Sequence, residues 1–201
     1  MDDAKNEGGS LDLQVLHSLG EILTAEGQKI AIVAVGGSAL ILQGFVQRAT
    51  QDIDIIALGR NPDEKGPGDI GPAEPIPEVL TGAITRIARD YGLPEDWMNT
   101  VVSMQWKTGL PPGFERRIHW DRYGGLWFGV ADRYDLIFLK LFAAADSGGP
   151  ESVHFQDLLA LNPTDKELED ATEWVRSQDI SHGFRIIVGQ VVDHVRKNLK
   201  R

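Results

Sequence analysis

Apolar residues recur at helical spacing near the start of the chain and then give way to short continuous runs. Residues 10–27 place leucine, valine and isoleucine on one helical face, with Ser10 suited to the N-cap and Gly27 to the stop. Residues 29–35 (KIAIVAV) and 52–58 (DIDIIAL) are short, apolar and rich in β-branched side chains. Such runs are typical of buried strands, so the pattern predicts a helix followed by two strands.

Glycine and proline mark the breaks between these elements. Gly36 and Gly37 end the first strand, and Ser38 is the expected N-cap of a short helix over residues 38–45. Residues 59–77 hold nine glycines or prolines in nineteen positions, which predicts a loop. Because this loop directly follows the second strand, it is either a lid over a site there or a surface insertion.

The second half of the chain is mainly helical in pattern. A helix over residues 77–92 precedes two strands within 115–131, which join through a glycine turn at Gly124-Gly125. Four further helices follow, over residues 132–148, 151–161, 163–178 and 181–200. This order predicts an α+β fold, a small mixed sheet flanked by helices and followed by a helical C-terminal part. The expected organisation is a disordered tail (1–9), an α+β core (10–131) and the helical part (132–201).

Composition limits where the chain works and what it binds. A formal net charge of −10 opposes non-specific binding to nucleic acid, although Arg116-Arg117 and residues 194–201 are locally basic. There is no cysteine, no signal-peptide pattern and no apolar run of membrane-spanning length. We therefore expect a cytoplasmic protein with no membrane partner.

The most informative polar residues are two aspartates at the start of the second strand. Residues two apart in a strand point to the same face, so Asp52 and Asp54 project together while Ile53 and Ile55 face the core. Two adjacent carboxylates repel each other unless a cation lies between them. Hard divalent ions with oxygen ligands suit them, Mg²⁺ (or Mn²⁺) above all. The alternative is that the pair simply faces solvent.

The glycine turn supplies a complementary feature. Gly36 and Gly37 before a helix allow backbone N–H groups to approach phosphate oxygens without a Cβ in the way, and Ser38 can add a hydroxyl. Alone, this turn is more often just a tight turn with a cap. In the order strand, glycine turn, helix, and strand with two aspartates, the combination indicates a site for a nucleoside triphosphate (NTP) held by metal ions.

Residues 36–55 (GGSALILQGFVQRATQDIDI) resemble the signature of DNA polymerase β-type nucleotidyltransferases. Within this superfamily the chain resembles more closely the small bacterial branch that includes AbiEii-type toxins of toxin–antitoxin and phage-defence systems, over roughly residues 30–175. The resemblance implies a nucleotidyltransferase-like small mixed sheet flanked by helices. The resemblance implies that Asp52 and Asp54 hold catalytic metal ions. It also implies that substrate phosphates are held by the segment that precedes them; these positions are Gly36, Gly37, Ser38, Arg48 and Thr50.

Two later residues also match the family pattern, although this part of the pattern is less specific. AbiEii-type proteins carry a helical lysine and a later helical aspartate, which Lys140 and Asp157 match as candidate catalytic residues. Lys140 lies in an apolar helix, so it needs a phosphate, an ion pair with Asp157, or a route to solvent along the helix edge. Arg48 either neutralises phosphate charge or anchors its own loop to a carboxylate.

Active members of the superfamily carry a third carboxylate on a neighbouring strand, and Asp121 in the hairpin is the candidate here. If Asp121 points to solvent, catalysis at this site is in doubt and the interpretation as an inactive relative gains support. His119, Asp121 and His154 match no zinc-ligand spacing, so an ordinary surface origin is favoured for them.

The leading hypothesis is a metal-dependent nucleotidyltransferase that moves a nucleoside monophosphate from an NTP to an acceptor hydroxyl. The resemblance implies an RNA end or a protein as acceptor, and a toxin–antitoxin or phage-defence role with a cognate antitoxin. The main alternative is a catalytically inactive nucleotidyltransferase-fold binding or regulatory protein. A kinase, which would release a nucleoside diphosphate, is a third and weaker alternative.

Overall fold

The computed structural model describes residues 13–48, 50 and 52–199, and it has the predicted α+β fold. Its strands are β1 (Ile30–Val35), β2 (Ile53–Arg60), β3 (Asp69–Pro72), β4 (Met98–Asn99), β5 (His119–Tyr123) and β6 (Leu126–Val130). Its α-helices are α1 (Leu13–Ala25), α2 (Gly36–Leu42), α3 (Glu78–Tyr91), α4 (Met104–Thr108), α5 (Arg133–Asp146), α6 (Val153–Ala160), α7 (Asp165–Gln178) and α8 (His182–Leu199). The expected tail over residues 1–9 and the expected cap Ser10 lie outside the described residues.

The strands form one mixed sheet in the order β3-β2-β1-β6-β5. The central strand β1 runs antiparallel to β2 and parallel to β6, and β5 closes the far edge as the hairpin partner of β6. Strand β4 also pairs with β2, in parallel, at Ile53 and Asp54, while β3 pairs with β2 further along, from Ala57 to Arg60. The start of β2 therefore has β1 on one side and β4 on the other.

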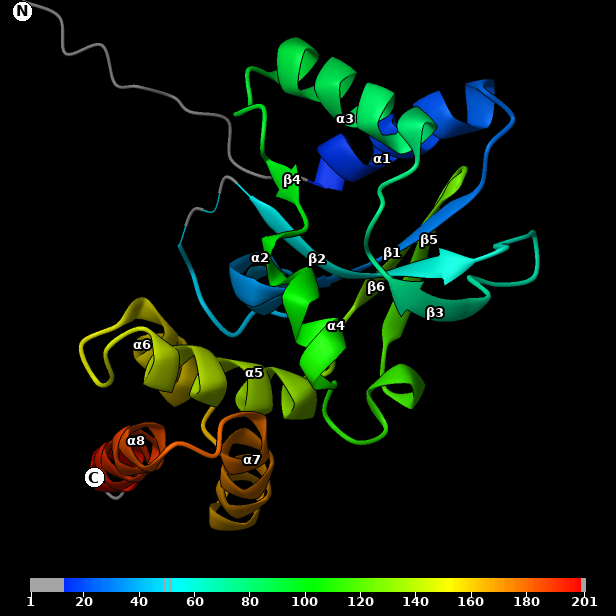
Figure 1. The fold of residues 1–201 in the computed structure, drawn as a ribbon. Helices are drawn as coiled ribbons and strands as arrows, with labels where there is room; N and C mark the ends of the chain where they lie inside the picture. The colour runs from blue at the N-terminus through cyan, green and yellow to red at the C-terminus, as the bar shows by residue number, and fades with distance from the viewer. Residues whose placement is uncertain (1–12, 49, 51, 200–201) are drawn as a thin grey trace, which may run out of the picture.

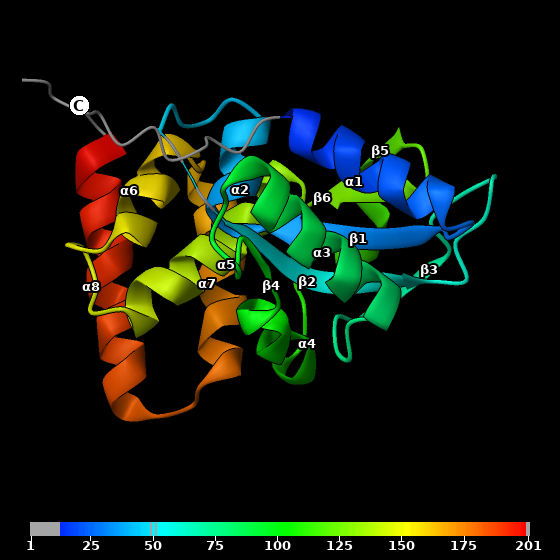
Figure 2. The same cartoon turned by 90° about the horizontal axis from the view of Figure 1, so that it is seen from above.

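Helices α1 and α3 lie side by side on one face of the sheet, and α5 to α8 gather on the other side, toward one end (Figures 1 and 2). The predicted helical face of α1 is the buried one, since Leu16, Leu19 and Leu23 are at most 1% exposed. Burying this apolar face supplies most of the stability of such a helix. The two helical layers leave the ends of β1 and β2 facing the C-terminal helices.

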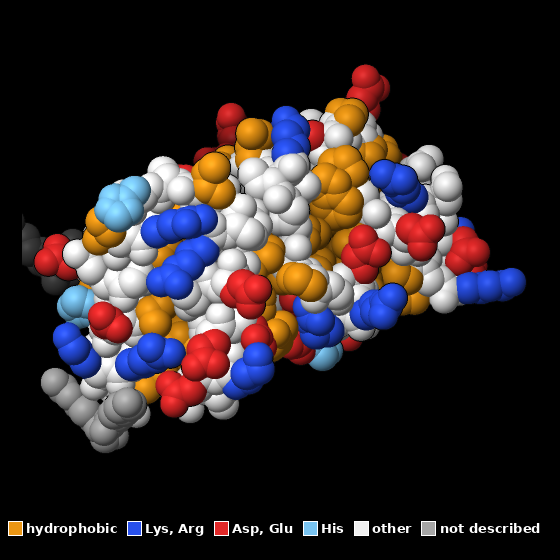
Figure 3. All heavy atoms as spheres, turned by 60° about the horizontal axis from the view of Figure 1, so that its bottom comes forward, with side chains coloured by type: hydrophobic (Ala, Val, Ile, Leu, Met, Phe, Trp, Pro, Cys, Tyr) orange, Lys and Arg blue, Asp and Glu red, His pale blue; other side chains and the backbone are white. Residues whose placement is uncertain are grey.

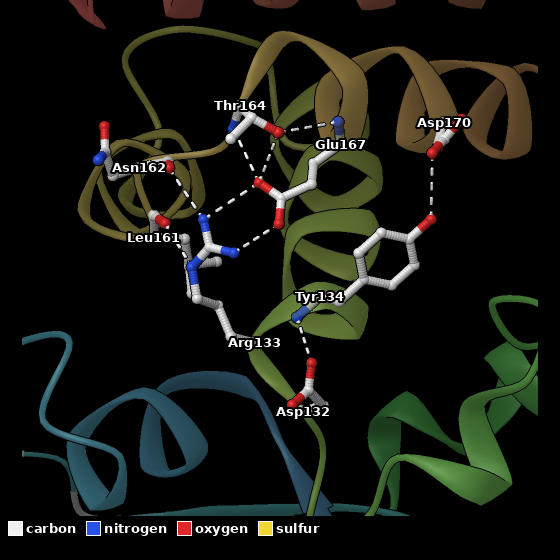
Figure 4. A network of polar contacts seen from close by, with 8 residues as sticks. All are labelled: Asp132, Arg133, Tyr134, Leu161, Asn162, Thr164, Glu167 and Asp170. Atoms are coloured by element: carbon white, nitrogen blue, oxygen red, sulfur yellow. Dashed lines mark hydrogen bonds and ion pairs between the residues drawn. The ribbon is translucent and has the colours of Figure 1, made fainter.

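A polar network fixes α5 against α7 (Figure 4). Arg133, in the first turn of α5, forms an ion pair with Glu167 of α7 and donates to the backbone carbonyls of Leu161 and Asn162. Glu167 also completes the predicted capping box with Thr164. Arg133 holds the pKa of Glu167 below its usual range, chiefly by hydrogen bonding. The network matters for the site because α5 carries Lys140.

Three local predictions are wrong. The short helix begins at Gly36 and has Val35 as its N-cap, so Ser38 lies inside the helix and does not cap it. The segment predicted as a loop over 59–77 includes the end of β2 and all of β3. The turn between β2 and β3 lies at the end of β2 that is away from Asp52 and Asp54. There Glu64 forms ion pairs with Lys29 and Arg122. The lid interpretation of this segment is therefore wrong as well.

Within the described residues, no helix combines the length and apolar character needed to cross a membrane. On the face drawn in Figure 3, acidic and basic side chains are interspersed among apolar ones, and no broad basic surface forms. Of the basic pair Arg116-Arg117, Arg117 is already neutralised within the protein, because it forms an ion pair of 2.5 Å with the fully buried Asp135.

Candidate active site

A cavity of about 590 Å³ lies between the sheet and the C-terminal helices. Its sheet-side wall consists of the Gly36-Gly37 turn after β1 together with Arg48, Thr50, Asp52 and Asp54. Residues of α5 and α6 form the opposite wall. The apolar part of the lining comes from Val101, Val102 and Met104, together with Leu139 and Phe142 of α5. The volume is in the range of small-molecule and nucleotide sites.

The two aspartates both line this cavity. Asp54 lies in β2, and Asp52 precedes the strand by one residue. Ile53 and Ile55 are fully buried on the opposite side, as the alternation of strand side chains requires. Burial raises the pKa of Asp54, and the neighbouring Asp52 raises it further, while Lys140 and Asn99 act in the other direction. The shared orientation predicted for the two carboxylates is confirmed.

The glycine turn lies directly against Asp54. Gly36 has a φ of +74°, which favours glycine, and a Cβ at this position would overlap Oδ2 of Asp54. A Cβ on Gly37 would come within 3.3 Å of the Arg48 guanidinium and 3.8 Å of the Thr50 hydroxyl. The turn and the acid pair therefore share one cavity, and the absence of side chains on the glycines is what allows their close approach.

Thr50 and Ser38 have different places in this geometry. The hydroxyl of Thr50 donates to Oδ1 of Asp52 at 2.7 Å and so orients that exposed carboxylate. Ser38 is 1% exposed, and its hydroxyl donates to the carbonyl of Val35 at 3.1 Å. Ser38 is absent from the cavity lining, so the structure gives it a role within the turn and not as a phosphate contact.

The opposite wall carries a compact cluster of charges. Asp157 of α6 is 2% exposed and accepts hydrogen bonds from Lys140 at 2.7 Å and from Arg48 at 2.9 and 3.0 Å. The predicted ion pair of Lys140 with Asp157 is therefore observed, and Arg48 anchors its own loop to the same carboxylate. Snorkelling of Lys140 to the surface is excluded, since its side chain is 5% exposed. Two cations around one carboxylate leave the cluster with an excess of positive charge.

Asp121 does not join the site. It is exposed on β5, the edge strand, with β6 and β1 between it and β2. Three strand spacings of about 4.8 Å place β5 roughly 14 Å from β2. The assignment of Asp121 as the third carboxylate is therefore wrong, because the strand order places the hairpin on the far side of the sheet.

Asn99 is a residue beside Asp54 that was not predicted from the sequence. It lies on β4, the strand beside β2, in register with Asp54. Its side-chain amide lowers the pKa of Asp54 by hydrogen bonding. A side-chain amide does not accept a proton as a carboxylate does, so β4 offers no carboxylate beside Asp54 that could act as a general base. A strand of two residues gives almost no periodic signal in the sequence.

The donor set fits a divalent cation in one respect. Asp52 and Asp54 are carboxylates without an ion-pair partner among the described residues, and they lie side by side. Within the same described ranges, no three acidic or histidine side chains are grouped to hold an ion by themselves. The pair therefore suits an ion such as Mg²⁺ that completes its coordination with substrate oxygens and water.

The sequence comparisons agree with the architecture of this site. The family model described as a nucleotidyltransferase of unknown function (DUF6036) matches residues 12–161, which include both walls of the cavity. No curated protein matches the chain. No solved structure matches it either.

Proposed function

The chain is a member of the family of nucleotidyltransferases of unknown function (DUF6036), and from this premise we propose that it catalyses metal-dependent nucleotidyl transfer. In this proposal a nucleoside monophosphate moves from an NTP to an acceptor hydroxyl. The observation that carries the proposal is that Asp52 and Asp54 share a cavity with the Gly36-Gly37 turn and form no ion pair with any residue that the structure describes.

Asp52 and Asp54 are the residues that would hold the metal ion, Mg²⁺ or Mn²⁺. A bound ion would neutralise charge on the phosphate oxygens and on the departing pyrophosphate. Thr50 holds Asp52 in place through its hydrogen bond to Oδ1. The raised pKa of Asp54 supports this assignment, because a buried carboxylate beside another one gains stability when a cation arrives.

The other walls would bind the rest of the nucleotide. Gly36 and Gly37 let the backbone approach the phosphates closely, and the positive cluster of Lys140, Arg48 and Asp157, in which Arg48 lies against Gly37, would attract them. The apolar part of the lining offers a surface for the base and sugar. The walls together would hold the nucleotide in one orientation, which is where such enzymes gain much of their rate.

In the reaction, an oxygen of the acceptor hydroxyl forms a bond to the α-phosphorus. The bond from that phosphorus to the bridging oxygen breaks, and pyrophosphate leaves. Because β4 places Asn99 beside Asp54 and carries no carboxylate, the hydroxyl proton passes to solvent without a general base from this strand. A modest turnover is therefore expected, since a positioned base contributes typically 10²–10⁴-fold.

The acceptor in this proposal is an RNA end or a protein hydroxyl. Resemblance to AbiEii-type toxins supports a toxin–antitoxin or phage-defence setting with a cognate antitoxin. A net charge of −10 favours a small acceptor contact at the cavity mouth over a broad nucleic-acid surface.

Asn99 also favours a second candidate, a catalytically inactive nucleotide-binding or regulatory protein. Without a third carboxylate, the cavity could retain nucleotide and metal binding while chemistry is lost. This candidate predicts nucleotide binding without pyrophosphate release.

The test is an incubation of the full chain with Mg²⁺, α-labelled and γ-labelled NTPs and cell extract. Transfer of α-label with release of pyrophosphate supports nucleotidyl transfer, and an Asp52→Asn/Asp54→Asn variant should lose it by at least about 100-fold. Asp121→Asn is the matched control, because it removes an exposed carboxylate outside the cavity and should retain full activity. Binding without transfer supports the inactive protein, and transfer of the γ-label with a nucleoside diphosphate as product supports a kinase.

A further inference from the structure

His154 lines the cavity from α6, and none of the roles proposed so far uses it. Its Nδ1 atom is buried and has no hydrogen-bond partner in the described part of the protein. The imidazole as a whole is only partly buried. Since Nδ1 is the enclosed nitrogen, Nε2 is the atom left to face the cavity.

The surroundings of His154 select one protonation state. Burial lowers the pKa of His154, and the charges of Lys140 and Arg48 lower it further, while Asp157 alone opposes them. The ring is therefore neutral at pH 7 and carries a single proton. A proton on Nδ1 would be a buried N–H without an acceptor, close to two cations, and such orphaned donors are rare in proteins. The proton consequently sits on Nε2.

This state limits what the side chain can do. Neutral imidazole with a proton on Nε2 is a hydrogen-bond donor toward the cavity and offers no lone pair there. To act as a base through Nε2, it would have to place a proton on the enclosed Nδ1. The ligand atom that suits it is an acceptor, and the neighbouring Lys140–Asp157–Arg48 cluster has excess positive charge that favours an anionic one.

We propose that His154 is a substrate-binding residue that donates its Nε2 proton to a phosphate oxygen of the bound nucleotide. This inference rests on the proposed function only for the identity of the ligand as a nucleotide. The geometry of the ring and the charge around it do not depend on whether transfer occurs.

The protonation state can be tested without any ligand. In full-length protein labelled with ¹⁵N-histidine, a long-range ¹H–¹⁵N correlation spectrum at pH 7 distinguishes the two neutral tautomers and the cation. Assignment by comparison with His154→Gln identifies the resonances. Protonation on Nε2 supports the inference, whereas protonation on Nδ1 or on both nitrogens would overturn it.

The contact itself is tested by titrating the chain with a non-hydrolysable NTP and, separately, with pyrophosphate, each with Mg²⁺. His154→Leu removes the donor and should weaken binding of both ligands by about 10- to 100-fold, in line with a hydrogen bond to a charged group. His154→Gln places an amide nitrogen near the same point and should stay within about threefold of the wild type. His182→Gln, at an exposed histidine outside the cavity lining, is the matched control and should bind like the wild type.

The outcomes separate this inference from the proposed function. Unchanged binding by His154→Leu, with a native circular dichroism spectrum, would overturn the His154 contact and leave nucleotidyl transfer standing. Pyrophosphate binding that depends on His154, without nucleotide binding, would overturn the proposed function and support the contact. No binding of either ligand by the wild type would overturn both.

Discussion

The half-buried Asp54 and the buried Asp157 line the same cavity, and the protein treats their charges in opposite ways. Asp157 receives hydrogen bonds from both Lys140 and Arg48. Asp54 has no ion-pair partner in the described residues and faces a second carboxylate, so its pKa is raised by burial and by Asp52. A charge neutralised within the protein holds the structure together, whereas an uncompensated one is available to a ligand.

The largest expected effect comes from removing the compensated carboxylate. Asp157→Ala leaves Lys140 buried without its counter-charge, and breaking a buried ion pair in this way costs about 3–5 kcal/mol. Urea denaturation should show the corresponding fall in the free energy of unfolding. The double variant Lys140→Met/Asp157→Leu should recover most of the loss. A fall below about 1 kcal/mol for Asp157→Ala would show that the pair is not buried as described.

Next in size is the close approach of the glycine turn to the uncompensated carboxylate. Gly36→Ala introduces a Cβ into the space of Asp54 at a φ of +74°, and strain and overlap together should cost about 2–4 kcal/mol. Gly44 is the matched control, because it has a φ of +77° with nothing within 4 Å of an added Cβ. Gly44→Ala should cost only about 1 kcal/mol. Equal thermal shifts for both variants would contradict the contact between Gly36 and Asp54.

Divalent ions should stabilise the protein through the uncompensated pair. At an Mg²⁺ or Mn²⁺ concentration ten times the dissociation constant, binding adds about 1.4 kcal/mol to the free energy of unfolding. Thermal unfolding with and without EDTA measures this shift. Asp54→Asn should abolish it, and Asp121→Asn should preserve it. A shift retained in Asp54→Asn would place the ion elsewhere.

The smallest expected effect is a gain in stability, opposite in sign to the loss expected for Asp157→Ala. In EDTA at pH 7, Asp54→Asn should stabilise the protein by about 1 kcal/mol, because it removes a charge whose burial is unfavourable. The folded-state pKa of Asp54 lies above its ordinary value of 3.8, so the folded state binds its proton more tightly than the unfolded state. The wild type therefore loses stability as pH rises through this window, and the advantage of Asp54→Asn should shrink as pH falls toward 3.8. An advantage independent of pH would show that charge is not its cause.

The same comparison shows which parts of the site the sequence reveals. Alternation in DIDI predicts that Asp52 and Asp54 share a face, and the lining of the cavity by both side chains confirms it, although β2 begins only at Ile53. The apolar context of Lys140 predicts a buried partner, and Asp157 is that partner because an enclosed ammonium needs a counter-charge. Both predictions depend only on local geometry and on the cost of burying charge.

Residues that reach the site through tertiary pairing were missed or misplaced. The hairpin of β5 and β6 was predicted correctly, but local pattern does not set the order of strands, and that order moves Asp121 away from the site. Asn99 lies on a strand of two residues, too short for a periodic signal. His154 was read as a surface residue, because only the folded arrangement shows that Nδ1 is enclosed beside the charge cluster.

The distribution of the cavity between two parts of the chain has a practical consequence for engineering. A truncation after residue 131 would retain Asp52, Asp54 and the glycine turn, yet it would delete Lys140, His154 and Asp157. A chimaera that transplants only the sheet into a relative would likewise meet foreign helices across the cavity. Any portable unit must extend at least through α6, which ends at Ala160, one residue before the end of the family match at 161.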